Sequence, residues 1–198
     1  MAKLKNWDPG IKKRRIIDSA ISILNKKEYY RIPVDEIAKK AGVAKGTIYL
    51  YFKSKEEIYF SVIFTLIDRA KAMIDEVGSK DISAREQFTL LLDTMTDFLS
   101  RNRQIFMSIR QQLEPVKGKF QAELHKKFFE IICSIGLIIE KGIKSREFKN
   151  FNPYVVSALV FSTATLIAHR QIAGGREEIS ITPSLLKDIL LNGIGRQK

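Results

Sequence analysis

Residues 32–52, IPVDEIAKKAGVAKGTIYLYF, are the stretch of the chain that decides its fold. From Val34 onward, apolar residues recur at i, i+3, i+4 and i+7, which is the spacing of one face of a helix. Gly42 follows at the point where a helix C-terminus favours a residue with positive φ. Beyond it, Ile48 and Phe52 have the spacing of two inward-facing residues of a second short helix. The pattern predicts two helices with a tight glycine turn between them.

Two helices joined in this way form a helix-turn-helix, whose second helix can enter the major groove of DNA. The outward-facing residues of the second helix are a cation, a hydroxyl and two phenols, with a glycine among them: Lys45, Gly46, Thr47, Tyr49 and Tyr51. Such groups suit phosphate oxygens and base edges. The alternative is a basic surface helix of a small bundle. It fits less well, because solvation alone does not favour aromatic residues on an exposed helix.

The charge of the chain also indicates a polyanionic partner. The net charge is +12 for 198 residues, and residues 1–60 carry +7 of it, with 14 Lys and Arg against 7 Asp and Glu. Four consecutive cations, Lys12 to Arg15, begin the first predicted helix, where they oppose the helix dipole. DNA phosphates could compensate these charges. A solvated run of charges is an equally good interpretation of any one of the four.

Composition excludes several other classes of protein. The chain is 45% hydrophobic, which is enough to bury a core, and it lacks the alternating pattern of β-strands. Cys133 is the only cysteine, which fits a reducing compartment. The N-terminus has no apolar segment typical of a signal peptide, and no apolar run is long enough to span a bilayer. We therefore expect a cytoplasmic protein that does not enter a membrane.

The sequence offers no constellation for catalysis or metal binding. It contains two histidines and one cysteine at distant positions. It has no metal-ligand spacing, no nucleophile elbow and no glycine-rich phosphate loop. We therefore expect that the chain is not an enzyme and needs no cofactor.

The rest of the chain predicts further helices, about nine in all. A capping-box pattern at Ser54 and Glu57 begins a long helix, and a second one at Ser83 and Glu86 begins another. Apolar residues continue at helical spacing from there toward the C-terminus. The predicted fold class is all-α, with an N-terminal three-helix domain that a long helix joins to a C-terminal helical bundle.

Residues 11–63 resemble the DNA-binding domain of the TetR/AcrR family of transcriptional repressors. The matching residues are Ile17, Ala20, Leu24, Tyr29, Val34, Ile37, Ala38, Ala41–Val43, Lys45–Tyr49, Tyr51, Phe52 and Ser54–Glu56. Glu28 replaces a usual glycine, and residues 32–33 replace a pair of hydroxyl residues, although a proline can still begin a helix. Lys141–Pro153 resembles a helix-to-helix connection of the family, with Arg146 in place of its second glycine.

The resemblance implies a ligand-responsive repressor that binds a palindromic operator in double-stranded DNA as a homodimer and is released by a small, hydrophobic effector. It also implies a DNA-binding domain at residues 1–54 and a ligand-binding and dimerisation domain at residues 55–198. Lys55 resembles the family lysine that touches a DNA phosphate. The expected DNA contacts are Arg15, Pro33, Ala44, Lys45, Gly46, Thr47, Tyr49, Tyr51 and Lys55.

The predicted helices of the second domain carry aromatic and methionine stripes. By pattern alone such stripes more often form a core, whereas the resemblance favours an effector pocket. The expected ligand-binding residues are Phe88, Met95, Phe106, Arg110, Phe128 and His169. The last two helices could pair with their copies across a two-fold axis, or they could complete the monomer core. The expected dimer contacts are Val155, Leu159, Ser162, Leu166, Leu185 and Ile189.

One alternative from a different functional class stays open. A sequence-indifferent nucleic-acid-binding protein without effector control could use the same basic face. Such a protein would bind DNA of different sequences with similar affinity.

Overall fold

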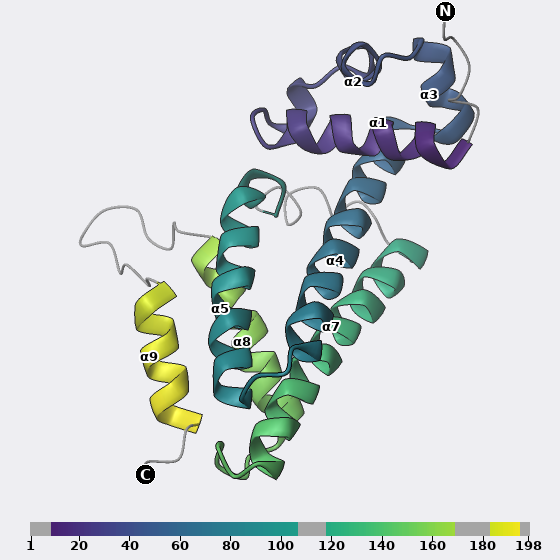
Figure 1. The fold of residues 1–198 in the computed structure, drawn as a ribbon. Coiled ribbons are helices and arrows are strands. Elements are labelled where there is room, and N and C mark those ends of the chain that lie inside the picture. Colours follow the sequence, from purple (N-terminus) through teal and green to yellow (C-terminus); the bar gives the residue numbers. More distant parts are fainter. Residues whose placement is uncertain (1–8, 107–117, 169–182, 195–198) are drawn as a thin grey trace, which may run out of the picture. The chain divides into compact units, whose positions relative to one another are not determined.

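The computed structural model describes residues 9–106, 118–168 and 183–194. These residues form eight α-helices and one 3-10 helix and contain no strand, which confirms the predicted all-α fold (Figure 1). In chain order the elements are α1 (Pro9–Leu24), η1 (Tyr29–Arg31), α2 (Val34–Ala41), α3 (Lys45–Tyr51), α4 (Lys55–Ser79), α5 (Ala84–Arg101), α7 (Lys119–Lys144), α8 (Pro153–Ala168) and α9 (Pro183–Ile194).

The chain divides into two compact units. Unit 1 comprises Met1–Leu66 and Gln104–Phe120, and unit 2 comprises Ile67–Arg103 and Gln121–Lys198. The division falls inside α4, a single helix of 25 residues. This division reflects how the residues pack. The predicted boundary between residues 54 and 55 separates DNA binding from ligand binding and dimerisation, and it stays a prediction.

Unit 1 contains the predicted helix-turn-helix. α1 packs on α2, and α2 packs on α3. Gly42 ends α2 with φ 63°, and its N–H donates to the carbonyls of Ala38 and Lys39. Ile48 and Phe52 are buried as the spacing predicts. The left-handed turn lets the chain reverse within three residues, so that α3 can follow α2 at once.

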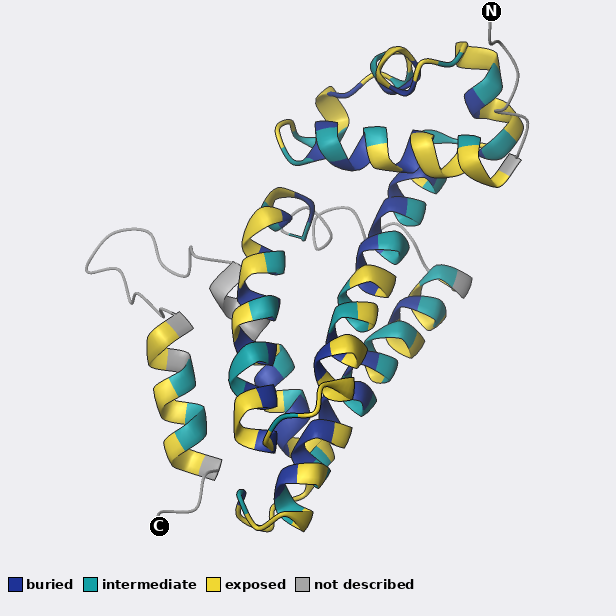
Figure 2. Cartoon of the chain, in the orientation of Figure 1, coloured by how far each residue is buried: buried dark blue, intermediate teal, exposed yellow. Residues whose placement is uncertain are grey.

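Unit 2 is built from α5, α7, α8, α9 and the second part of α4. α5 packs against α8 and α9, and α8 also contacts α9. Figure 2 shows buried residues on α4, α5, α7 and α8, whereas the described residues of α9 are exposed or intermediate. The apolar core includes Phe88, Leu91, Leu92, Ile131, Ile135, Ile138, Phe148, Val156 and Val160.

The two predicted capping boxes have different outcomes. At the start of α5, Ser83 and Glu86 form the full reciprocal pair, as predicted. At the start of α4, the Ser54 hydroxyl accepts from the Glu57 N–H at 3.3 Å. The Glu57 carboxylate, however, accepts from the N–H of Lys53 at 2.6 Å, one residue before the expected cap. The prediction of a full capping box at Ser54 is therefore wrong in its second half, because the Glu57 side chain reaches past the cap residue.

The connection after α7 places a side chain in the left-handed region. Arg146 has φ 61° and is the only residue other than glycine with positive φ in the described ranges. The N–H groups of Glu147 and Phe148 both donate to the Gly142 carbonyl, at 2.8 and 2.9 Å. This is how a helix C-terminus satisfies its last carbonyls, and it requires a left-handed residue after the helix. The arginine therefore occupies a position that favours glycine.

We expect Arg146→Gly to raise the free energy of unfolding by about 1 kcal/mol, because glycine adopts this conformation without the steric cost of a Cβ. For a chain of this size, the thermal midpoint should rise by about 2–4 °C. Gly142→Ala is the matched control, since a Cβ there would overlap the Phe148 ring and should lower the midpoint. A midpoint for Arg146→Gly at or below that of the wild type would show that Arg146 is not strained.

Candidate nucleic-acid interface

The outer face of α3 gathers most of the predicted DNA contacts. Ile48 is the only buried residue of the helix. Ala44, Lys45, Gly46 and Tyr49 are exposed, and Thr47 and Tyr51 are half-buried. The structure thus brings these six predicted residues together on one short helix and its N-cap. Their side chains offer a cation, a hydroxyl and phenols to an external partner, which is the chemistry that phosphates and base edges accept.

Leu50 belongs to the same face but is absent from the predicted contacts. Its side chain is 82% exposed, although it is apolar and lies two residues from the fully buried Ile48. The spacing of Ile48 and Phe52 assigns both residues to the inner face of the helix, and that same spacing places Leu50 outside. An apolar side chain at this place can contact the methyl group of a thymine.

The starts of α2 and α3 are linked by an ion pair. The Lys45 ammonium lies 2.9 Å from the Asp35 carboxylate, with both side chains more than half exposed. The hydrogen bond to Asp35 raises the pKa of Lys45 and keeps the amine charged. Pro33 is the exposed N-cap of α2 and makes no side-chain cap hydrogen bond. The Glu36 N–H donates to the Pro33 carbonyl at 3.0 Å, whereas those of Val34 and Asp35 can bond to an external acceptor.

Arg15 has an intramolecular role that its sequence pattern does not indicate. Its Nη2 donates to the Ala41 carbonyl at 2.8 Å, across 26 residues of sequence. The bond satisfies one of the carbonyls that the end of α2 leaves without a helical partner. A guanidinium has five N–H donors, so this bond does not exclude the predicted phosphate contact.

Lys55 is held against an aromatic ring. Its ammonium lies 4.4 Å from the centroid of the Tyr29 ring and 3.5 Å from the Tyr30 carbonyl. Partial burial lowers the pKa of Lys55. The Tyr29 hydroxyl donates to Glu56 at 3.1 Å, and burial together with that carboxylate raises the pKa of Tyr29 far above its ordinary range. The cation–π contact fixes the amine in position before any partner binds.

The predicted ligand-binding residues that the structure describes lie on several elements, and their grouping in one pocket stays a prediction. Phe88 and Met95 are buried on α5, and the Phe88 ring packs edge-on against Phe148 at 5.7 Å. Phe128 of α7 is half-buried, with its ring 5.3 Å from that of Phe161. These residues belong to unit 2, whereas Phe106 belongs to unit 1. The remaining two predicted residues, Arg110 and His169, lie outside the described residues.

The predicted dimer contacts are exposed. Val155, Leu159, Leu185 and Ile189 are 45–59% exposed, although all are apolar. Ser162 is also exposed, and the side chain of Leu166 lies outside the described part. This much exposure is not expected of residues that complete a monomer core. A group of apolar residues at the surface is typical of an interaction site.

Membrane spans and metal clusters are both absent from the described residues. None of their helices has the length and hydropathy needed to cross a membrane. Within the same residues, no group of three or more His, Cys, Asp or Glu could hold a metal ion.

Comparisons with known proteins agree on one family. Residues 16–62 match the family model described as bacterial regulatory proteins, tetR family. The fatty acid metabolism regulator protein of Bacillus subtilis (strain 168) is 32% identical over 139 residues, which cover 68% of this chain and 70% of that protein.

Solved structures share the fold. A transcriptional regulator of the TetR/AcrR family from Thermobifida fusca YX-ER1 has a TM-score of 0.73 at 24% identity, over 93% of this chain and 99% of that chain. The transcriptional regulator FadR from Bacillus subtilis, in complex with stearoyl-CoA, has a TM-score of 0.70 at 23% identity, over 91% and 98%. At these identities the likeness is one of fold.

The orientation of α3 can be tested through stability. We expect Ile48→Ala to lower the free energy of unfolding by about 2–5 kcal/mol, because it leaves a cavity in the core. Leu50→Ala should change it by less than about 0.5 kcal/mol, because the side chain is exposed. Urea denaturation of both variants gives the comparison. A cost above about 1 kcal/mol for Leu50→Ala would mean that Leu50 packs inside the protein and is not available to a partner.

Proposed function

This chain belongs to the tetR family of bacterial regulatory proteins, and on that premise we propose that it is a repressor of transcription. It binds a palindromic operator as a homodimer and leaves the operator when a small, hydrophobic effector binds. As a member of the family it is a DNA-binding transcriptional regulator and not an enzyme. The observation that carries the proposal is the outer face of α3, where Lys45, Tyr49 and Leu50 are exposed and Thr47 and Tyr51 are half-buried.

The proposed division of labour follows from the chemistry of each side chain. Lys45, Thr47 and Tyr51 on α3 reach base edges, where donors and acceptors differ between base pairs. Lys55 and Arg15 contact phosphates, which fixes the position of α3 on the duplex without reading sequence. A two-fold dimer places two copies of α3 on half-sites about one helical turn, or about 34 Å, apart. The palindrome in the proposal reflects this symmetry.

The exposed face of α8 and α9 supports dimerisation. Its apolar residues lie on two helices that contact each other in unit 2. Pairing with the same helices of a second copy would bury these residues in a four-helix bundle. The hydrophobic free energy gained is about 25 cal/mol for each Å² of apolar surface removed from water.

Contacts inside unit 1 link a predicted effector residue to a predicted phosphate contact. Phe106 follows Ile105, whose carbonyl accepts a hydrogen bond from Tyr59 of α4 at 3.4 Å. The Tyr59 ring lies 4.8 Å from that of Tyr29, against which Lys55 is held. We propose that these contacts have two arrangements, of which one binds DNA and the other does not. An effector that binds the second arrangement better would shift the population toward that arrangement and lower the affinity for DNA.

The first effector class to test is a long-chain acyl-CoA. A relative of this chain is a fatty acid metabolism regulator, and one protein of the same fold is in complex with stearoyl-CoA. A long acyl chain also satisfies the proposed hydrophobic chemistry of the effector.

Fluorescence anisotropy with a duplex selected from a random pool tests the proposed function. We expect tight binding of two subunits to a palindromic sequence at near-physiological salt, much weaker binding to a scrambled duplex, and release when stearoyl-CoA is added. Lys55→Ala should weaken binding to every sequence alike and reduce the salt slope by about one ion. Equal binding to selected and scrambled duplexes would favour the sequence-indifferent alternative. A change of sequence preference in Lys55→Ala would refute its role as a phosphate contact.

Dimerisation is tested by placing charge on the exposed face. We expect the double variant Val155→Asp/Leu159→Asp to sediment as a monomer, because a dimer would bury two uncompensated carboxylates in each copy. Leu137→Asp on α7 is the matched control, since Leu137 is also exposed and apolar but lies outside the predicted interface. A dimeric double variant, or a monomeric Leu137→Asp, would place the interface elsewhere.

A further inference from the structure

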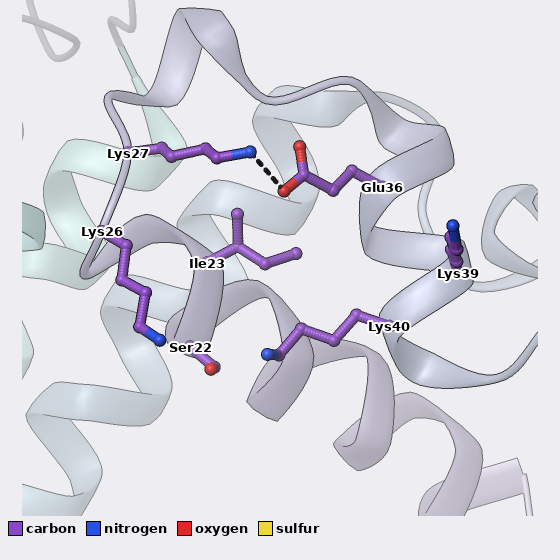
Figure 3. A pocket seen from close by; sticks show the side chains of 7 residues that line it. All are labelled: Ser22, Ile23, Lys26, Lys27, Glu36, Lys39 and Lys40. Carbon is purple, nitrogen blue, oxygen red and sulfur yellow. Dashed lines mark hydrogen bonds and ion pairs between the residues drawn. The ribbon is translucent and has the colours of Figure 1, made fainter.

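A basic groove lies in unit 1 between the end of α1 and α2 (Figure 3). Its volume is about 530 Å³, and it is lined by Ser22, Ile23, Lys26, Lys27, Glu36, Lys39 and Lys40. None of these seven residues is among the predicted DNA contacts. The groove therefore has no role in the function proposed above.

The groove carries an excess of positive charge that the protein does not neutralise. Lys27 and Glu36 form an ion pair at 2.7 Å, drawn as the dashed line in Figure 3. The other three ammonium groups, those of Lys26, Lys39 and Lys40, make no ion pair with any described residue. Three like charges around one hollow repel one another, and an anion that enters the groove relieves this repulsion.

The side chains that line the groove suit phosphate groups. Ile23 is buried and forms part of its lining, and the hydroxyl of Ser22 adds a neutral donor. In Figure 3 the side chain of Lys26, from the turn after α1, and that of Lys40, from α2, extend toward Ser22. Lysine binds a phosphate as a flexible point charge, so several of them can follow a backbone without reading bases.

The groove is separate from the DNA contacts already predicted. Arg15 lies nine residues before Leu24, the last residue of α1, or about 14 Å at the helical rise, and Lys26 follows in the turn beyond it. Along α2, Lys39 and Lys40 follow Pro33 by about 10 Å. A phosphate held in the groove is therefore not one of the phosphates bound at the start of either helix. Double-stranded DNA presents one charge for about every 1.7 Å of its axis, so a duplex that continues beyond the operator supplies further phosphates.

We propose that the basic groove binds backbone phosphates of the DNA that flanks the operator. The contact adds affinity but no sequence preference, and it extends the protected length of DNA beyond the base pairs that α3 reads. This inference rests on the proposed function, because it takes the operator as given. The other source of the same chemistry is a free phosphorylated small molecule.

The test uses the triple variant Lys26→Ala/Lys39→Ala/Lys40→Ala of the full chain and two duplexes. One duplex ends at the operator, and the other carries ten further base pairs on each side. We expect the wild type to bind the flanked duplex more tightly and with a steeper salt dependence. The triple variant should not show this gain, and its salt slope should be smaller by up to about 0.9 for each phosphate that it no longer neutralises. On the short duplex the two proteins should bind alike.

Two further variants separate a local contact from net charge. The triple variant Lys80→Ala/Lys126→Ala/Lys144→Ala removes three lysines of unit 2 and should keep the gain on the flanked duplex. The triple variant Lys26→Arg/Lys39→Arg/Lys40→Arg keeps the charge of the groove and should keep the gain as well. All six substituted lysines are exposed, so the variants should fold with stabilities within about 0.5 kcal/mol of the wild type.

The groove variant is the protein with Lys26→Ala/Lys39→Ala/Lys40→Ala. The proposal is overturned if the wild type and the groove variant gain the same DNA affinity from the flanking base pairs. It is also overturned if inorganic pyrophosphate raises the thermal midpoint of the wild type, but not of the groove variant, while the flanks have no effect. That result would assign the groove to a free phosphorylated ligand. A wild type that does not distinguish the operator from a scrambled duplex would refute the proposed function, and the salt slope on flanked DNA would still decide the role of the groove.

Discussion

The burial of Ile48 and Phe52 is the interaction on which the candidate site depends. Both side chains are inside unit 1, where Ile48 lies in the middle of α3 and Phe52 is its C-cap. Because a helix places neighbouring positions on different faces, their burial leaves Tyr49, Leu50 and the start of α3 outside. The left-handed residue Gly42 allows this arrangement, since it ends α2 and lets the chain turn directly into α3.

The positive charge of unit 1 is arranged in several distinct ways. The Arg15 guanidinium bonds to the end of α2, and Lys55 rests on an aromatic ring. Lys45 is paired with Asp35, whereas three lysines of the groove have no acidic partner among the described residues. A cation that already has a protein partner is held in position, whereas an unpaired one gains more from an arriving phosphate. The cations of unit 1 can therefore serve both to position the protein on DNA and to raise its affinity for DNA.

Apolar residues of unit 2 have two opposite environments. Phe88 lies in the core against Phe148, whereas Leu159 and Ile189 are more than half exposed. In the sequence all three look alike, because each lies on an apolar face of a helix. Only the neighbours supplied by other helices decide whether such a face completes the core or remains available to a second copy.

The sequence by itself determined the features that depend on residues within about one helical turn. These include the all-α class, the turn at Gly42, the cap at Ser83 and the inward direction of Ile48, because periodicity and capping are local. The same patterns placed five of the predicted DNA contacts on one helix. Tertiary structure alone decided the Arg15–Ala41 bond, the ring beneath Lys55 and the basic groove. Each joins residues at least ten positions apart or on different helices, and the physical reason is that such contacts depend on how helices pack, which no local pattern records.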